Sequence, residues 1–123
     1  MKVSGLAVFV LSYLSTAALA DPNSGQTVTV QLSNDQSGAN ANAAVPADGQ
    51  KHSVESIWGH TSVAKDGCIY VSSAQLVAFQ QNTVCVLFGE GDHAILTSRQ
   101  TWVSLKGGKV VNLKDSWIVC DNI

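Results

Sequence analysis

The sequence contains no apolar segment long enough to cross a bilayer. Its longest apolar stretch, residues 6–14, is well short of the roughly 20 residues that a transmembrane helix needs. Lys2 precedes this stretch, and an Ala-Leu-Ala cleavage site follows it and ends at residue 20, an arrangement typical of a secretory signal peptide. We therefore expect residues 1–20 to be removed on export, leaving residues 21–123 as one soluble, secreted domain that does not associate with membranes.

Positive charge is also scarce. Residues 21–123 contain six basic and nine acidic side chains, and Arg99 is the only arginine in the sequence. The resulting net charge of −3, with the histidines neutral, gives no basic footprint for nucleic acid or for an anionic membrane. We expect partners of neither kind.

Motifs for catalysis and metal binding are lacking as well. The chain contains neither a Gly-x-Ser-x-Gly nucleophile elbow nor a His-Glu-x-x-His pair. Its three histidines, at positions 52, 60 and 93, follow no recurrent zinc-ligand spacing. The residues that could supply acid–base chemistry are Glu55, His60, Glu90, His93 and Arg99. We interpret them as ordinary surface residues, and we expect no catalytic residue, no metal site and no cofactor.

The segment GEGDH, residues 89–93, is the strongest test of that interpretation. Glu90 and Asp92 offer oxygen ligands for Ca²⁺, but this ion needs six to eight, and Gly and Asp are the residues that tight turns favour. We predict a solvated hairpin turn between TVCVLF and HAILTS. The alternative is a small hydrolase or ribonuclease whose activity would depend on His93 and Arg99.

Three cysteines are an odd number for an exported protein, so one disulfide should leave one thiol over. Cys85 in TVCVLF and Cys120 in SWIVCD lie in apolar, strand-like segments, whereas Cys68 follows the turn sequence Lys-Asp-Gly. We predict a Cys85–Cys120 disulfide and a free thiol at Cys68. The protein is then a monomer or a Cys68-linked dimer, and a disulfide from Cys68 to either other cysteine would contradict the pairing.

Alternating apolar and polar residues predict β-structure along most of residues 21–123. In TVTVQL, residues 27–32, apolar side chains alternate with Thr and Gln, as in a half-buried strand. The segment SSAQLVAFQQ also fits a short capped helix, and Lys-Gly-Gly at 106–108 predicts a hairpin between the strands TWVSL and KVVNL. The other strand-like segments are SVESIW, TSVA, CIYVS, TVCVLF, HAILTS and SWIVC. We predict an all-β, single-domain fold, a small β-sandwich or barrel.

Residues 33–52 interrupt this pattern. They contain two glycines, one proline and a single large apolar residue, Val45, so we predict one long polar loop, draped over the domain or used for binding. Asn40, Asn42 and Asp48 are its candidate contact residues.

Trp102 is the fourth candidate contact residue. If Val103 and Leu105 face the core, the pleat turns Trp102 and Ser104 outward and leaves the indole near solvent, as in many sugar-binding and protein-binding surfaces. By the same argument, a core position for Cys120 turns Trp117 the other way. The alternative is that a covering loop buries the tryptophans in a two-sheet sandwich.

Several segments together resemble a group of small exported proteins of filamentous fungi. They are TVTVQLSNDQSGANANAAVPADG, SSAQLVAFQQ with the later Cys85, and ILTSRQTWVSL followed by VVNLKDSWIVCDN. The resemblance covers nearly all of residues 21–123, and two cysteines of the group match Cys85 and Cys120, whereas Cys68 lies outside its pattern. It implies a fungal origin and an extracellular setting, in which such proteins are considered candidate effectors acting on a host or a competitor, and it implies no catalytic mechanism.

The residues and the resemblance together predict a secreted binding protein that acts by recognition and not by catalysis. The expected partner is an extracellular protein or a glycan. The first alternative is a structural or glycan-binding component of the fungal wall or matrix, and the second is the small hydrolase or ribonuclease described above.

Overall fold

The computed structural model describes residues 26–89 and 92–123. Residues 1–20, expected to form the signal peptide, lie outside these ranges, as do Glu90 and Gly91 of the predicted hairpin turn. In chain order the elements are β1 (Thr27–Ser33), β2 (Asn40–Pro46), β3 (His52–Ser53), α1 (Val54–Trp58), β4 (Ala64–Lys65), β5 (Cys68–Val71), β6 (Ser73–Ala78), β7 (Thr83–Gly89), β8 (Asp92–Thr97), β9 (Trp102–Ser104), the 3₁₀ turn η2 (Lys106–Gly108), β10 (Val111–Asn112) and β11 (Trp117–Asn122).

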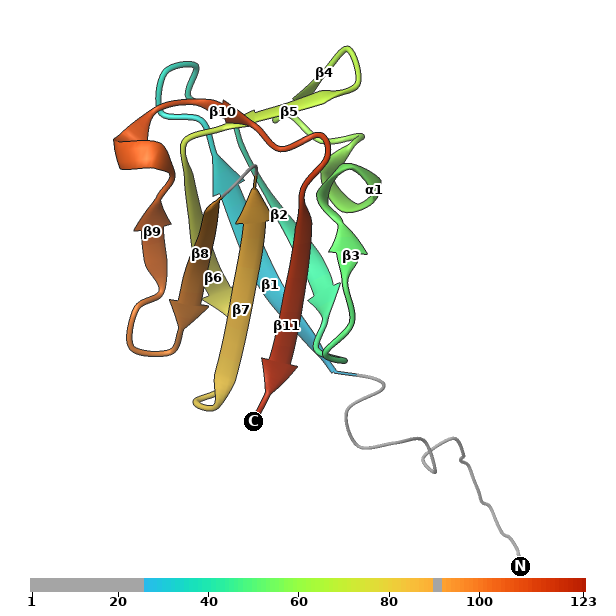
Figure 1. The fold of residues 1–123 in the computed structure, drawn as a ribbon, viewed down its shortest axis with the longest axis vertical. Coiled ribbons are helices and arrows are strands. Elements are labelled where there is room, and N and C mark those ends of the chain that lie inside the picture. The colour runs from blue at the N-terminus through green and yellow to red at the C-terminus, as the bar shows by residue number, and fades with distance from the viewer. Residues whose placement is uncertain (1–25, 90–91) are drawn as a thin grey trace, which may run out of the picture.

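Two four-stranded antiparallel sheets form the layers of the domain. The front sheet has the strand order β3-β11-β7-β8 and faces the viewer in Figure 1, and the back sheet, β2-β1-β6-β9, lies behind it. A small third sheet, β10-β5-β4, crosses the upper end in that view. The all-β prediction is confirmed, and the sheets remain open, with no closed barrel among the described strands. No helix in the described ranges is long and apolar enough to span a membrane.

The core lies between the front and back sheets because each sheet turns one set of alternating residues inward. On β1, Val28, Val30 and Leu32 are fully buried and belong to the same cluster as Leu87 of β7 and Ile118 of β11. The half-buried strand predicted from TVTVQL is therefore confirmed, and the intervening Thr and Gln side chains point away from the core.

The predicted disulfide joins the two central strands of the front sheet. Cys85 of β7 and Cys120 of β11 are directly opposite each other in the ladder, both fully buried, with an S–S distance of 2.09 Å. Cys68, on β5, is a partly buried free thiol. Both assignments made from the sequence are confirmed.

The segment SVESIW forms the helix α1, so its prediction as a strand is wrong. Ser53 caps the helix by accepting a hydrogen bond from the backbone N–H of Ser56 at 3.2 Å. Val54 and Trp58 are four residues apart, so a helix puts both on one face, and both are buried. The indole N–H of Trp58 also donates to the carbonyl of Ala41 at 3.2 Å, which ties the helix to the back sheet.

The prediction of one long polar loop over residues 33–52 is also wrong, because residues 40–46 in its middle form a strand that pairs with β1. Asn34 closes a tight turn by accepting hydrogen bonds from the N–H groups of Gln36 and Ser37, and β2 then runs antiparallel to β1 along seven residue pairs. As an edge strand, β2 turns only Val45 and small alanines toward the core. Its pattern therefore lacked the large apolar residues that identify a strand in sequence.

The hairpin predicted at residues 106–108 does not form. β9 pairs with β6 in the back sheet, whereas β10 pairs with β5 in the small sheet. Positive φ angles at Lys106, Gly107 and Gly108 turn the chain out of one sheet and toward the other. The ambiguous SSAQLVAFQQ contains a strand, β6, and the predicted hairpin of TVCVLF with HAILTS is confirmed by the pairing of Gly89 with Asp92.

Candidate binding surfaces

The outward side of the back sheet carries a row of amides that ends in a tryptophan. The strand register places Asn42 of β2, Gln31 of β1, Gln75 of β6 and Trp102 of β9 side by side. Val103 packs against the core and Leu105 is buried, so Trp102 points outward and is 51% exposed. The predicted orientation of Trp102 and Ser104 is confirmed. We call the outward side of β2-β1-β6-β9, centred on this row, the amide face.

The neighbouring row of the amide face continues the same chemistry. It runs from Asn40 through Ser33 and Ser73 to Ser104. None of the outward residues on these four strands, all of which lie in the described ranges, carries a charge. Three of the four candidate contact residues, Asn40, Asn42 and Trp102, therefore share one uncharged surface.

Asp48, the fourth candidate, lies elsewhere. It sits in the turn between β2 and β3, where its carboxylate accepts hydrogen bonds from the N–H of Gln50 at 2.9 Å and from Nε2 of His52 at 3.0 Å. The Gln50 hydrogen bond is the main reason that the pKa of Asp48 lies below its ordinary value, and His52 adds to the effect. These contacts assign Asp48 to the geometry of the turn.

The outward side of the front sheet is unexpectedly apolar. The register aligns Trp117 of β11 with Phe88 of β7 and His93 of β8, and it aligns Val119, Val86 and Ile95 in the next row. Trp117 is 44%, Phe88 36% and Ile95 47% exposed. We call Val86, Phe88, Ile95, Trp117 and Val119 the apolar face.

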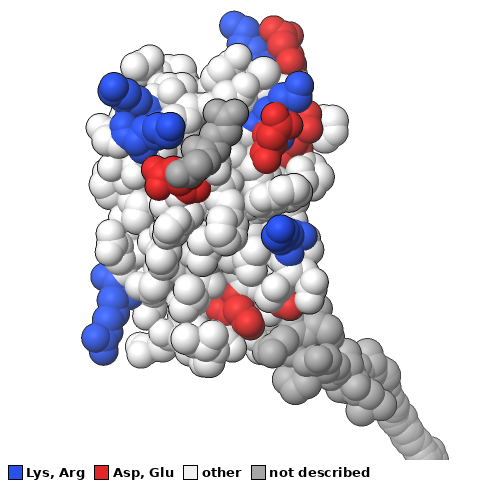
Figure 2. Space-filling model, in the orientation of Figure 1, with Lys and Arg blue, Asp and Glu red and all other residues white. Residues whose placement is uncertain are grey.

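Among the described residues, charged groups lie around the apolar face and not at its centre. Figure 2 shows a largely uncharged middle with basic and acidic side chains around the border. The ammonium of Lys51 lies 5.0 Å from the centre of the Trp117 ring, a cation–π contact that holds the indole in place. Asp121 is on the outward side of β11, one row beyond Val119.

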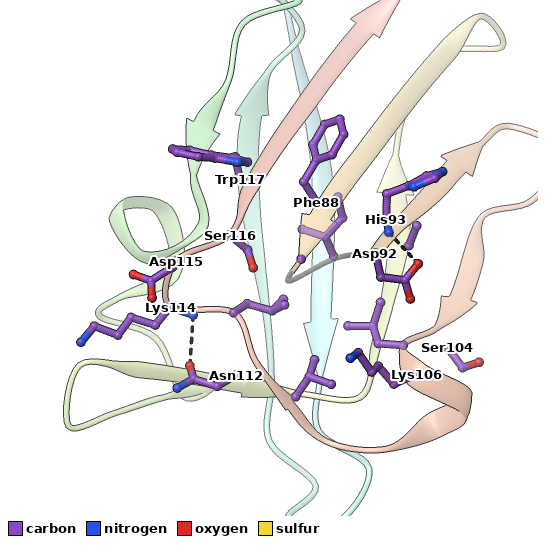
Figure 3. Close-up of a pocket in the computed structure, with 16 residues that line it drawn as sticks. Phe88, Asp92, His93, Ser104, Lys106, Asn112, Lys114, Asp115, Ser116 and Trp117 are labelled. Atoms are coloured by element: carbon purple, nitrogen blue, oxygen red, sulfur yellow. Dashed lines mark hydrogen bonds between the residues drawn. The ribbon is translucent and has the colours of Figure 1, made fainter.

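A pocket of about 500 Å³ opens at one end of the apolar face. Phe88 and Trp117 line its border with that face, and Lys106, Asp115 and Ser116 contribute polar groups (Figure 3). Two of its other polar side chains serve local turns. Asp92 accepts from the N–H of His93 at 2.8 Å, and Asn112 accepts from the N–H of Lys114 at 3.0 Å.

The structure does not gather the acid–base candidates into one site. Glu55 is on α1 and His60 follows that helix, whereas His93 begins β8 and Arg99 lies beyond its end. His93 and Arg99 lie near opposite ends of β8: the extended chain from His93 to Thr97 spans about 13 Å before it turns at Ser98 and Arg99, too far for joint action on one substrate atom. Among the described residues, no three His, Cys, Asp or Glu side chains are close enough to hold a metal ion. Glu90 lies outside the described residues.

Cys68 is held in the hairpin between β4 and β5. Asp66 and Gly67 both have positive φ between the paired residues Lys65 and Cys68, as a two-residue type I′ hairpin turn requires. A hydrogen bond with the Cys68 side chain is the main cause of a raised pKa at Tyr70, two residues along the same strand. The Cys68-linked dimer stays a prediction.

Trp102, Asn40 and Asn42 were predicted from the sequence, whereas Gln31 and Gln75 were missed. The outward turn of Trp117 was also predicted and is confirmed, but the rest of the apolar face was overlooked. The sequence signal for this face was the segment TVCVLF, in which almost every residue is apolar. Because side chains alternate between the two sides of a strand, such a segment is apolar on its outward side as well.

Comparison with known proteins does not place the chain in a family. No family model matches the chain, and neither the curated proteins nor the solved structures contain a match.

Proposed function

We propose that this protein is an exported binding protein whose apolar face recognises another extracellular protein, and that it acts by recognition and not by catalysis. The exposed aromatic and aliphatic side chains of the front sheet carry the proposal. One side of a two-layer antiparallel sheet normally meets water and is polar. Here that side exposes Phe88, Ile95 and Trp117 together, and contiguous apolar surface of this kind marks interaction sites.

The surroundings of the apolar face favour a protein partner. Protein interfaces have an aromatic and aliphatic centre with a polar, charged rim. Phe88, Ile95 and Trp117 supply such a centre here, and Figure 2 shows charged side chains around the border of this side of the molecule. Lys51 and Asp121 represent both charge signs at this rim. A nucleic acid or an anionic membrane would require an excess of basic residues instead.

Export is part of the proposal. The Cys85–Cys120 disulfide supports it, because such bonds persist in oxidising, extracellular environments. The proposed biological setting is that of a fungal effector acting on a host or competitor protein, in keeping with the resemblance of the sequence to small exported fungal proteins.

Site-specific photo-crosslinking tests the proposal. Phe88 and Tyr70 are similarly exposed aromatic residues, but Phe88 is on the apolar face and Tyr70 is on the small sheet, so a benzophenone amino acid at each position gives a matched probe and control. The mature protein would be irradiated in concentrated extracellular fluid from a host or from competing microbes. We expect a discrete adduct from the Phe88 probe alone.

Competition completes the test. Excess unlabelled wild-type protein should abolish the adduct, whereas Trp117→Ala protein should compete at least about tenfold less well, a loss of about 1.4 kcal/mol. Identical adducts from both probes, or equal competition by the variant, would refute recognition through the apolar face. An adduct between two copies of the chain would replace the proposed partner by self-association.

A further inference from the structure

The amide face differs in chemistry from the apolar face on the other side of the core. Its central row contains three amide side chains and one indole, Asn42, Gln31, Gln75 and Trp102. Because neighbouring strands lie about 4.8 Å apart, the row extends for about 14 Å across the four strands. It is therefore an elongated surface that ends in a half-exposed aromatic ring.

Each feature of the row suits a polyhydroxylated ligand. An amide carries both donors and an acceptor, so it can satisfy a hydroxyl group in either role. The indole of Trp102 offers a flat apolar surface to the C–H side of a sugar ring, together with an N–H donor at its edge. In the neighbouring row Ser73 is buried, but the half-buried Ser33 and the exposed Ser104 add hydroxyl groups beside the amides.

The absence of charge from the outward residues of these strands selects the class of glycan. A uronic acid or a sulfated sugar would need a basic side chain to replace the water that it loses on binding, and none is present on the outward side of β1, β2, β6 and β9. A neutral polysaccharide needs no such basic side chain.

We propose that the amide face is a binding site for a neutral polysaccharide, whose chain lies across the strands along the row from Asn42 to Trp102. The proposal goes beyond the recognition of a protein by the apolar face, because it assigns a second ligand class to the opposite surface. The same molecule then holds a wall polysaccharide with one sheet and a protein with the other.

Two tryptophans provide a matched pair of variants for the test. Trp102 and Trp117 are 51% and 44% exposed, on the outward sides of the back and front sheets respectively. The mature wild-type protein, Trp102→Ala and Trp117→Ala would be mixed with insoluble β-glucan, chitin and cellulose, and the protein remaining in solution would be measured after sedimentation. Soluble pectate, an anionic polysaccharide, serves as the charged control in affinity electrophoresis.

We expect at least one neutral polysaccharide to deplete the wild type and Trp117→Ala equally, and we expect Trp102→Ala to bind at least about tenfold more weakly. Pectate should not retard the protein. Comparison of β-glucan, chitin and cellulose then tells whether the neutral polymer is of fungal or plant origin.

A second variant covers the case in which Trp102→Ala is misfolded. Gln75→Glu is nearly isosteric and places a charge in the middle of the row, so it should weaken binding to the same polymer while the thermal unfolding midpoint stays close to that of wild type. The proposal is overturned if no neutral polysaccharide depletes the wild type. It is equally overturned if Trp102→Ala and Gln75→Glu bind like the wild type, or if Trp117→Ala loses binding to the same extent. None of these outcomes bears on the crosslinking of a protein to Phe88.

Discussion

Replacing both Cys85 and Cys120 by alanine tests how much stability comes from the bond between the two central strands of the front sheet. The bond joins residues 35 positions apart, and for a loop of this length the chain-entropy model gives about 4 kcal/mol of stabilisation. A domain of this size has a total free energy of unfolding of roughly 5–15 kcal/mol. The loss should therefore lower the unfolding midpoint by about 15–30 °C.

Urea unfolding, followed by tryptophan fluorescence, measures this loss. Trp58 is fully buried, so its emission should change when the core opens. The wild type with and without reductant, the Cys85→Ala/Cys120→Ala variant and Cys68→Ser would be compared. Because Cys68 forms no disulfide, Cys68→Ser should stay within about 0.5 kcal/mol of the wild type.

Two results would refute this reasoning. One is a free energy of unfolding of the double variant that lies within about 1 kcal/mol of the wild-type value. This would mean that the unfolded chain gains little freedom when the bond is removed. The other is a loss in Cys68→Ser that is as large as in the double variant, which would give the thiol a structural role that its hairpin position does not explain.

Three further predictions concern the helix, the β2–β3 turn and the apolar face. Trp58→Ala should destabilise the domain by about 3–5 kcal/mol, because it leaves a cavity at a fully buried site. Trp58→Phe removes the hydrogen bond to Ala41 but keeps an aromatic ring, so it should lose much less stability in the same urea assay. The lowered pKa of Asp48 means that its carboxylate stabilises the fold above the ordinary value of 3.8 and that this contribution is lost as the pH falls through the lower folded pKa. Asp48→Asn should therefore flatten the acid limb of a stability–pH profile, and an unchanged limb would contradict the assignment. Ile95→Thr should leave the free energy of unfolding within about 0.5 kcal/mol of the wild-type value but reduce binding of a hydrophobic dye to the protein. A larger loss of stability would mean that Ile95 belongs to the core.

The sequence predicted the fold class and the disulfide because both depend on short-range signals. Alternation in TVTVQL identifies β1, and the apolar surroundings of Cys85 and Cys120 distinguish them from Cys68. β2 was missed because two of its three inward residues are alanines, so its alternation lacks the large apolar side chains that identify β1. In SVESIW the serine cap and the apolar residues four positions apart were the signals of a helix, but a six-residue segment fits a strand pattern equally well.

The amide face could not be predicted because it depends on register. Asn42, Gln31, Gln75 and Trp102 come from four strands, and a shift of one residue in any pairing would turn its side chain toward the core. Turn geometry and core packing set that register, and neither is contained in a local pattern. The candidate residues Trp102 and Asn42 were found singly, whereas their alignment in one row is a tertiary property.

The arrangement of the two faces determines how their ligands affect each other. The apolar and amide faces are the outward sides of two sheets that share one core, and the inward residues of both sheets belong to a single buried cluster. Coupling between two sites requires two global states of the protein that each ligand binds with different affinity. A close-packed core that is cross-linked by the Cys85–Cys120 disulfide is poorly suited to a second arrangement. Occupation of the amide face should therefore leave the affinity of the apolar face unchanged. Under the two proposals, the shared core would fix the distance between a polysaccharide bound by one sheet and a protein bound by the other, so that the rigidity of the domain would connect them.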